Sequence, residues 1–91
     1  MRLISQNGRY DYPYEHCAVY RDENKIMCRL IGDEKAKVFA EYGSELRAGS
    51  VMEMLAEEYR RHYHSIGKAL MNSYEQSFGF IPPKEFQFPE A

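Results

Sequence analysis

Three histidines and two cysteines are the residues of this chain whose chemistry is typical of metal ligands and nucleophiles. His62 and His64 lie two residues apart in a segment with helical spacing, so their side chains point to roughly opposite sides and cannot bind one ion. His16 and Cys17 are neighbours in a segment with strand-like alternation, so a thiolate–imidazole pair is not expected. His62 follows Glu58 by four residues and is expected on the solvated helix face. We therefore expect neither a metal site nor a Cys–His pair.

Two carboxylates, Asp11 and Glu15, lie on either side of Pro13 among tyrosines. Acid–base catalysis by paired carboxylates requires a pocket that shifts one pKa, and an edge segment of so small a domain seldom provides one. The sequence also lacks a phosphate-binding loop and a nucleophile followed by its base. The chain is therefore predicted to be non-enzymatic, with no catalytic residue and no cofactor.

Composition restricts the remaining classes. The chain has 91 residues, which is enough for one domain with a thin core. Its 12 basic and 14 acidic side chains give a net charge of -2, which argues against nucleic-acid binding through bulk charge. No apolar run approaches the roughly 20 residues that cross a bilayer, and we expect no signal peptide. A cytoplasmic protein with no membrane association is predicted, with Cys17 and Cys28 as free core thiols.

The N-terminal half of the chain is predicted to consist of β-strands. Asn7-Gly8 predicts a hairpin with a type I′ turn, in which both central residues have positive φ, and residues 9–12 return as a strand that Pro13 interrupts. Residues 16–21 and 25–31 form a second hairpin. A two-residue loop at Glu23-Asn24 keeps the small apolar side chains on one face, with Val19 opposite Cys28 and Cys17 opposite Leu30. Residues 35–42 form a further strand whose buried face is Ala36, Val38 and Ala40.

A helix is predicted over residues 44–78, with Ser44 as its N-cap and an ion pair between Glu57 and Arg61. Its apolar stripe consists of Ala48, Met52, Leu55, Tyr59, His62 or Tyr63, and Ile66. Gly67 allows either one continuous or mildly kinked helix, which we favour, or a second helix. Residues 79–91 form an extended tail in which Phe86 and Phe88 share a face, as in an edge strand or a strap on the sheet.

These elements predict one α+β domain spanning residues 1–91. Residues 1–42 form an antiparallel sheet of about four strands, one long helix covers one face of it, and an extended C-terminal strip completes it.

Three stretches of the sequence carry a resemblance to known proteins: the opening MRLISQNGRYDYPYE, AEYGSELRAGSVMEMLAEEY over residues 40–59 and the closing FQFPE. In these stretches the sequence resembles a family of short proteins from Gram-positive bacteria and their phages or mobile elements. Residues 62–83 make this chain longer than the usual pattern of the family. The resemblance implies a phage or mobile-element origin and implies no activity, catalytic residue or ligand.

Two surfaces of the predicted helix could bind a partner. Eight tyrosines and five phenylalanines exceed what a thin core can hide, and tyrosine is favoured at interfaces. The first hypothesis is therefore a protein interface, with a second copy or another protein, formed by Tyr59, Tyr63, Ile66, Leu70 and Tyr74. The second is a small nucleic-acid-associated regulator that uses a basic face formed by Arg60, Arg61, His64 and Lys68.

Overall fold

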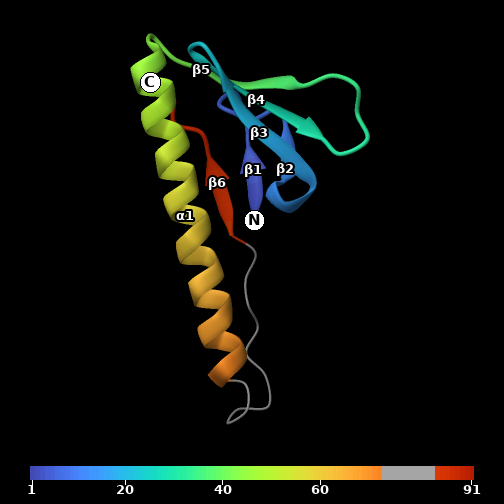
Figure 1. Ribbon diagram of the computed structural model, residues 1–91, viewed down its shortest axis with the longest axis vertical. Helices are drawn as coiled ribbons and strands as arrows, with labels where there is room; N and C mark the ends of the chain where they lie inside the picture. The colour runs from blue at the N-terminus through green and yellow to red at the C-terminus, as the bar shows by residue number, and fades with distance from the viewer. Residues whose placement is uncertain (73–83) are drawn as a thin grey trace.

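The computed structural model describes residues 1–72 and 84–91, and the side chains of residues 63–72 lie outside the description. Its elements are β1 (Arg2–Ile4), β2 (Asp11–Pro13), the 3-10 turn η1 (Tyr14–His16), β3 (Cys17–Asp22), β4 (Lys25–Leu30), β5 (Lys37–Glu41), α1 (Glu45–Asn72) and β6 (Glu85–Gln87). The fold is α+β, as predicted. In place of one sheet of four strands, however, the described strands form two three-stranded sheets, ordered β2-β1-β6 and β3-β4-β5, beside one helix (Figure 1).

The division into two sheets begins at Pro13. This residue ends β2, and η1 then turns the chain before β3 starts. Proline has no N–H to extend the ladder, so β2 pairs with β1 alone. The third strand of the first sheet is β6, which lies parallel to β1. Parallel pairing between strands so far apart in sequence leaves no local signal, which is why the sequence did not predict it.

The first hairpin forms, but its predicted turn is wrong. Gly8 N–H donates to the Ser5 carbonyl at 2.9 Å, so the central residues of the turn are Gln6 and Asn7. Gly8 has φ 77, whereas the one non-glycine residue with positive φ in the described chain is Glu23. The Asn7 side-chain oxygen accepts from Ser5 Oγ at 2.7 Å and from Arg9 N–H at 2.9 Å. These bonds stabilise a longer loop than a type I′ turn allows.

The second hairpin has the predicted register. Asp22 pairs with Lys25 across the two-residue loop, and the pairs Val19–Cys28 and Cys17–Leu30 follow. Burial agrees, because Cys28 and Ile26 on one face of β4 are fully buried. Both cysteines are free thiols; Cys28 is buried in the core as predicted, whereas Cys17 is only partly buried.

The predicted buried face of the next strand is correct at Ala40 and wrong at Val38, because β5 contains a β-bulge. Ile26 pairs with Ala40, and the next residue of β4, Met27, pairs with Val38, so Phe39 is the extra residue. The bulge places Phe39 and Ala40 in the core together, with Phe39 only 1% exposed, and leaves Val38 44% exposed. Strict alternation along the strand cannot anticipate this local change of phase.

The helix begins as predicted. Ser44 caps it, with Arg47 N–H donating to Ser44 Oγ at 3.1 Å, and it continues without a break through Gly67 to Asn72. The predicted end of the helix, at residue 78, lies outside the described residues. Figure 1 shows the last turns of α1 extending past the described strands.

The side of α1 that faces β3 and β4 differs in part from the predicted stripe. Ala48 and Leu55 are buried as expected, but so is Val51, which the stripe omitted. His62 is 9% exposed, so its placement on the solvated face is wrong, whereas the alternative that included it in the apolar stripe agrees. The predicted ion pair between Glu57 and Arg61 is present at 3.6 Å.

The core lies between the two sheets and α1. Phe86 and Phe88 are both buried, with ring centroids 5.1 Å apart and nearly perpendicular rings, so the predicted common face is confirmed. Phe88 also meets Phe39 edge to face at 6.1 Å. The C-terminal strip is therefore part of the core, and the pairing of β6 with β1 places EFQ of residues 85–87 beside RLI of residues 2–4.

Candidate protein-interaction surface

The predicted helical interface is described at one side chain only. Tyr59 is half-buried, and its ring lies 4.2 Å, centroid to centroid, from that of Tyr14. Tyr59 therefore packs within the domain. The side chains of Tyr63, Ile66 and Leu70 lie outside the described structure, although their backbone belongs to α1, and Tyr74 lies outside it altogether.

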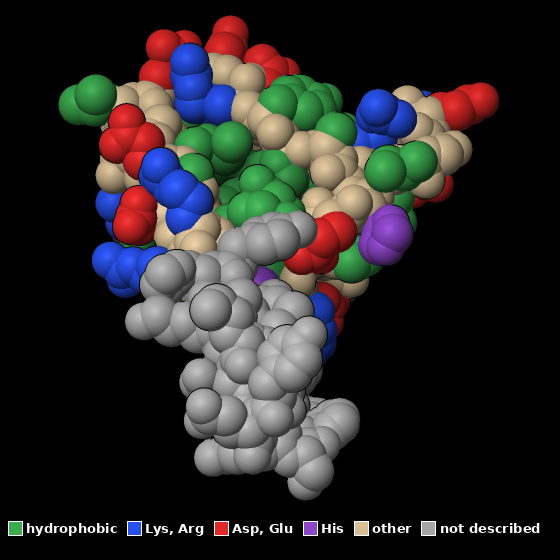
Figure 2. All heavy atoms as spheres, turned by 60° about the horizontal axis from the view of Figure 1, so that its bottom comes forward, with side chains coloured by type: hydrophobic (Ala, Val, Ile, Leu, Met, Phe, Trp, Pro, Cys, Tyr) green, Lys and Arg blue, Asp and Glu red, His purple; other side chains and the backbone are tan. Residues whose placement is uncertain are grey.

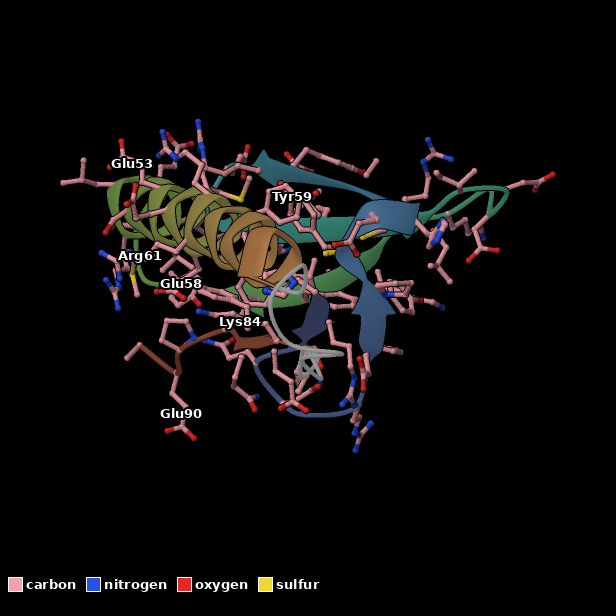
Figure 3. All side chains as sticks on the ribbon, turned by 90° about the horizontal axis from the view of Figure 1, so that it is seen from below. Glu53, Glu58, Tyr59, Arg61, Lys84 and Glu90 are labelled. Atoms are coloured by element: carbon pink, nitrogen blue, oxygen red, sulfur yellow. The ribbon has the colours of Figure 1, made fainter. Side chains whose placement is uncertain are left out.

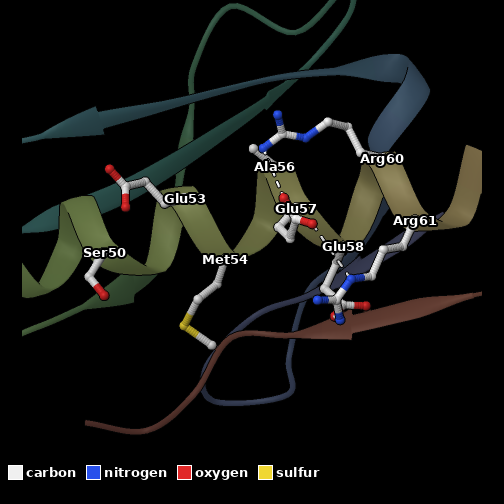
Figure 4. A pocket seen from close by; sticks show the side chains of 8 residues that line it. All are labelled: Ser50, Glu53, Met54, Ala56, Glu57, Glu58, Arg60 and Arg61. Carbon is white, nitrogen blue, oxygen red and sulfur yellow. Dashed lines mark hydrogen bonds and ion pairs between the residues drawn. The ribbon is translucent and has the colours of Figure 1, made fainter.

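The predicted basic face carries acidic partners. Arg60 pairs with Glu57 at 3.1 Å, and Arg61 contacts Glu57 at 3.6 Å and Glu58 at 3.5 Å (Figure 4). These carboxylates reduce the positive potential that would attract phosphates. Figure 2 shows a face on which charged side chains of both signs are interspersed around a hydrophobic centre. The side chains of His64 and Lys68 lie outside the description.

A salt bridge joins the helix to Lys84, the residue directly before β6. Lys84 Nζ lies 2.8 Å from Glu58 Oε2, and the two side chains approach each other from different elements (Figure 3). The hydrogen bond from Lys84 lowers the pKa of Glu58. Glu58 therefore links α1 to the chain beside β6 and is not only a solvent-exposed charge of the helix.

The carboxylates considered as candidate acid–base groups form ion pairs within the fold, and the two thiols are held by burial in their neutral form. Asp11 forms an ion pair with Arg2, whose guanidinium lowers the pKa of that carboxyl, and Glu15 lies 2.7 Å from the Met1 amino group. Burial raises the pKa of both thiols, that of Cys28 to about 12, which disfavours the reactive thiolate. Among the described residues, no group of three or more histidine, cysteine or acidic side chains is arranged to hold a metal.

A row of apolar side chains crosses the outer side of the sheet β3-β4-β5. Tyr20 pairs with Met27, and Met27 pairs with Val38, so these three residues, here called the outer apolar row, lie side by side on the face opposite Ile26 and Cys28. Tyr20 and Val38 are each 44% exposed. The sequence reasoning missed this row because it assigned Val38 to the core.

One edge of this sheet is closed by Gln6. Gln6 N–H donates to the Phe39 carbonyl at 2.7 Å, and its Oε1 accepts from Glu41 N–H at 3.1 Å. Its Nε2 donates to the carbonyls of Pro89 at 3.0 Å and Glu90 at 2.6 Å. A bulge and a side-chain cap on β5 are devices that prevent a further strand from adding there.

The opposite edge, β3, has a different character. Asp22 and Lys25 close the two-residue loop, and Ile31 N–H donates to the His16 carbonyl at 2.9 Å, which sets the phase of the ladder. In that phase Ala18, Tyr20 and Asp22 exchange hydrogen bonds with β4. The N–H and C=O groups of Val19 and Arg21 point away from β4. No backbone hydrogen bond within the described residues reaches them.

A groove runs beside this free edge, between β3 and the first turns of α1. It is lined by Arg21, Glu45, Leu46, Gly49, Ser50 and Glu53. Leu46 is 86% exposed, and a Cβ built on Gly49 meets nothing within 4 Å. Figure 3, seen from below, shows no described helix or strand beyond the edge of the sheet that β3 forms. An added strand therefore has room there.

Comparison with models of protein families, with curated proteins and with solved structures returned no match. No helix in the described part of the chain is long and apolar enough to span a membrane.

Proposed function

We propose that this protein is a non-catalytic protein-interaction module, an accessory protein of phage or mobile-element origin that binds a second copy of itself or another protein. The observation that carries this proposal is the outer apolar row, Tyr20, Met27 and Val38, on a sheet whose β3 edge is open within the described residues. Tyrosine and methionine are enriched in protein interfaces, and a surface that joins apolar side chains to unpaired backbone groups favours a protein ligand.

Nucleic-acid binding has less support. Arg60 and Arg61 both contact carboxylates of their own helix, and the chain as a whole is acidic. A protein that neutralises several phosphates normally presents an unopposed basic surface. Fluorescence anisotropy of labelled DNA and RNA oligonucleotides at low salt tests this alternative, and salt-sensitive binding that is lost in an Arg60→Ala, Arg61→Ala variant would favour it over the protein interface.

Multi-angle light scattering over about 1–200 µM tests the proposal. We expect the wild-type chain to shift from monomer to a higher mass, and a Tyr20→Lys, Val38→Lys variant to remain monomeric because lysine places charge in the outer apolar row. Ile31→Lys is the matched control, since Ile31 is 74% exposed but lies outside the row. Equal association of all three chains would show that the row is not an interface.

A wild-type chain that stays monomeric would remove self-association. The other form of the proposal, a different protein partner, would then be tested by comparing what the wild-type and Tyr20→Lys, Val38→Lys chains capture from the host. Capture that does not differ between the two chains would contradict the outer apolar row as the binding surface.

A further inference from the structure

From the free edge of β3 we infer that the partner is a second copy, paired β3 to β3 in antiparallel orientation with Tyr20 opposite Tyr20 of the other copy. This inference rests on the proposed function and specifies its partner and geometry. The β3-β4-β5 sheet of one copy would then join the β3-β4-β5 sheet of the other, and the two copies would share one sheet of six strands with a two-fold axis at its centre.

The backbone groups determine the register. Val19 and Arg21 each offer an N–H and a C=O away from β4, whereas Cys17 N–H already donates to the Tyr14 carbonyl. With Tyr20 at the two-fold axis, Val19 of each copy lies opposite Arg21 of the other, and all of these groups exchange hydrogen bonds. With Val19 at the axis, Arg21 would lie opposite Cys17, whose N–H is already bonded. The first register leaves no group of Val19 or Arg21 unpaired.

The side chains favour the same register. Tyr20 lies on the outer face, at the end of the outer apolar row. In this register the rows of the two copies meet end to end, in the order Val38, Met27, Tyr20 of one copy and then Tyr20, Met27, Val38 of the other. Two tyrosines in a non-hydrogen-bonded pair are close enough for ring contact. This continuity is what indicates a second copy rather than an unrelated strand.

Charge does not oppose this approach. On the inner face each Arg21 lies opposite Val19 of the other copy, and the two arginines are diagonal neighbours. Glu45 and Glu53 line the same groove as Arg21, so each guanidinium has acidic side chains nearby to offset the repulsion. Arg21 is further held by its hydrogen bond to the Glu23 carbonyl at 2.6 Å.

The first test uses the wild-type chain, so it does not depend on a variant folding. Amide hydrogen exchange is followed by NMR at a concentration where light scattering gives monomer and at one where it gives dimer. We expect the amides of Val19 and Arg21 to exchange at least about tenfold more slowly in the dimer than in the monomer. The exchange rates of the Ala18 and Tyr20 amides, which already bond to β4, should change little. A dimer without added protection at Val19 and Arg21 overturns the inference and leaves the proposed function standing.

The second test fixes the register by cross-linking. In a Cys17→Ser, Cys28→Ala background, single cysteines are placed as Tyr20→Cys, Val19→Cys and Ile31→Cys and oxidised with glutathione disulfide. We expect Tyr20→Cys to form the intermolecular disulfide fastest, because residues facing each other at the axis lie within disulfide distance. Fastest cross-linking at Val19 or Ile31 overturns the inference. A chain that is monomeric at every concentration overturns both the inference and the self-association on which it rests.

Discussion

Replacing Gln6 by alanine tests how the two sheets and the C-terminal strip are joined. The Gln6 side chain makes three hydrogen bonds, accepting one from Glu41 N–H and donating to the carbonyls of Pro89 and Glu90. A typical hydrogen bond contributes about 0.5–1.5 kcal/mol net, and this site is half-buried, so we expect Gln6→Ala to lower the free energy of unfolding by about 2 kcal/mol. In a domain of this size that corresponds to a fall in Tm of roughly 8–16 °C.

Gln87→Ala is the matched control, since the Gln87 side chain donates a hydrogen bond from Nε2 to the Ser5 carbonyl at 2.8 Å and makes none with Glu41 N–H. We expect Gln87→Ala to lower the free energy of unfolding by about 1 kcal/mol or less. Urea unfolding followed by circular dichroism measures both variants, and hydrogen exchange adds a local readout, because Glu41 N–H should exchange faster in Gln6→Ala but not in Gln87→Ala. Equal losses of stability with unchanged exchange at Glu41 would refute the role assigned to Gln6.

Three further predictions concern backbone conformation, the bulge and the buried thiol. Gly8→Ala should destabilise by about 1 kcal/mol because Gly8 has φ 77, whereas Gly49→Ala should stabilise by a similar amount because the helix gains propensity and the site has room, both measured by urea unfolding. Phe39→Ala should lower the free energy of unfolding by about 3–5 kcal/mol and Val38→Ala by less than about 1 kcal/mol, because the bulge buries Phe39 and exposes Val38. A larger loss of thermal stability in Val38→Ala than in Phe39→Ala would contradict the bulge. Because burial raises the pKa of Cys28 to about 12, the unfolded thiol ionises first, so stability should fall as pH rises above about 8.5, and urea unfolding of Cys28→Ala should show a shallower fall.

Local features of the fold could be predicted from the sequence. The register of the β3–β4 hairpin followed from keeping small apolar side chains on one face, and the structure has the same pairs. The Ser44 cap and the helix through Gly67 followed from capping chemistry and periodicity. These features depend on residues close together in the chain, where one physical preference dominates.

The rest depends on tertiary context. The bulge at Phe39 is stabilised by a hydrogen bond from Gln6, which lies far away in sequence, and it reversed the expected exposure of Val38. The parallel pairing of β6 with β1 joins two short segments whose patterns are compatible with many partners. The outer apolar row was missed for the same reason, since its third member depends on the bulge. A sequence pattern alone cannot supply these long-range contacts.

The parallel pairing of β1 with β6 has a consequence for the order in which this chain can fold during synthesis. Arg2 and Glu85, which form an ion pair across these strands, are 83 residues apart. When β1 emerges from the ribosome its hairpin partner follows at once, but the strand on its other side, and the Phe86 and Phe88 rings of the core, are translated only after the whole of α1. Until residues 85–88 leave the exit tunnel, one edge of β1 therefore has no β6 to pair with and the core lacks two of its rings, so we expect the nascent chain to be more open to aggregation and proteolysis before that point than after it.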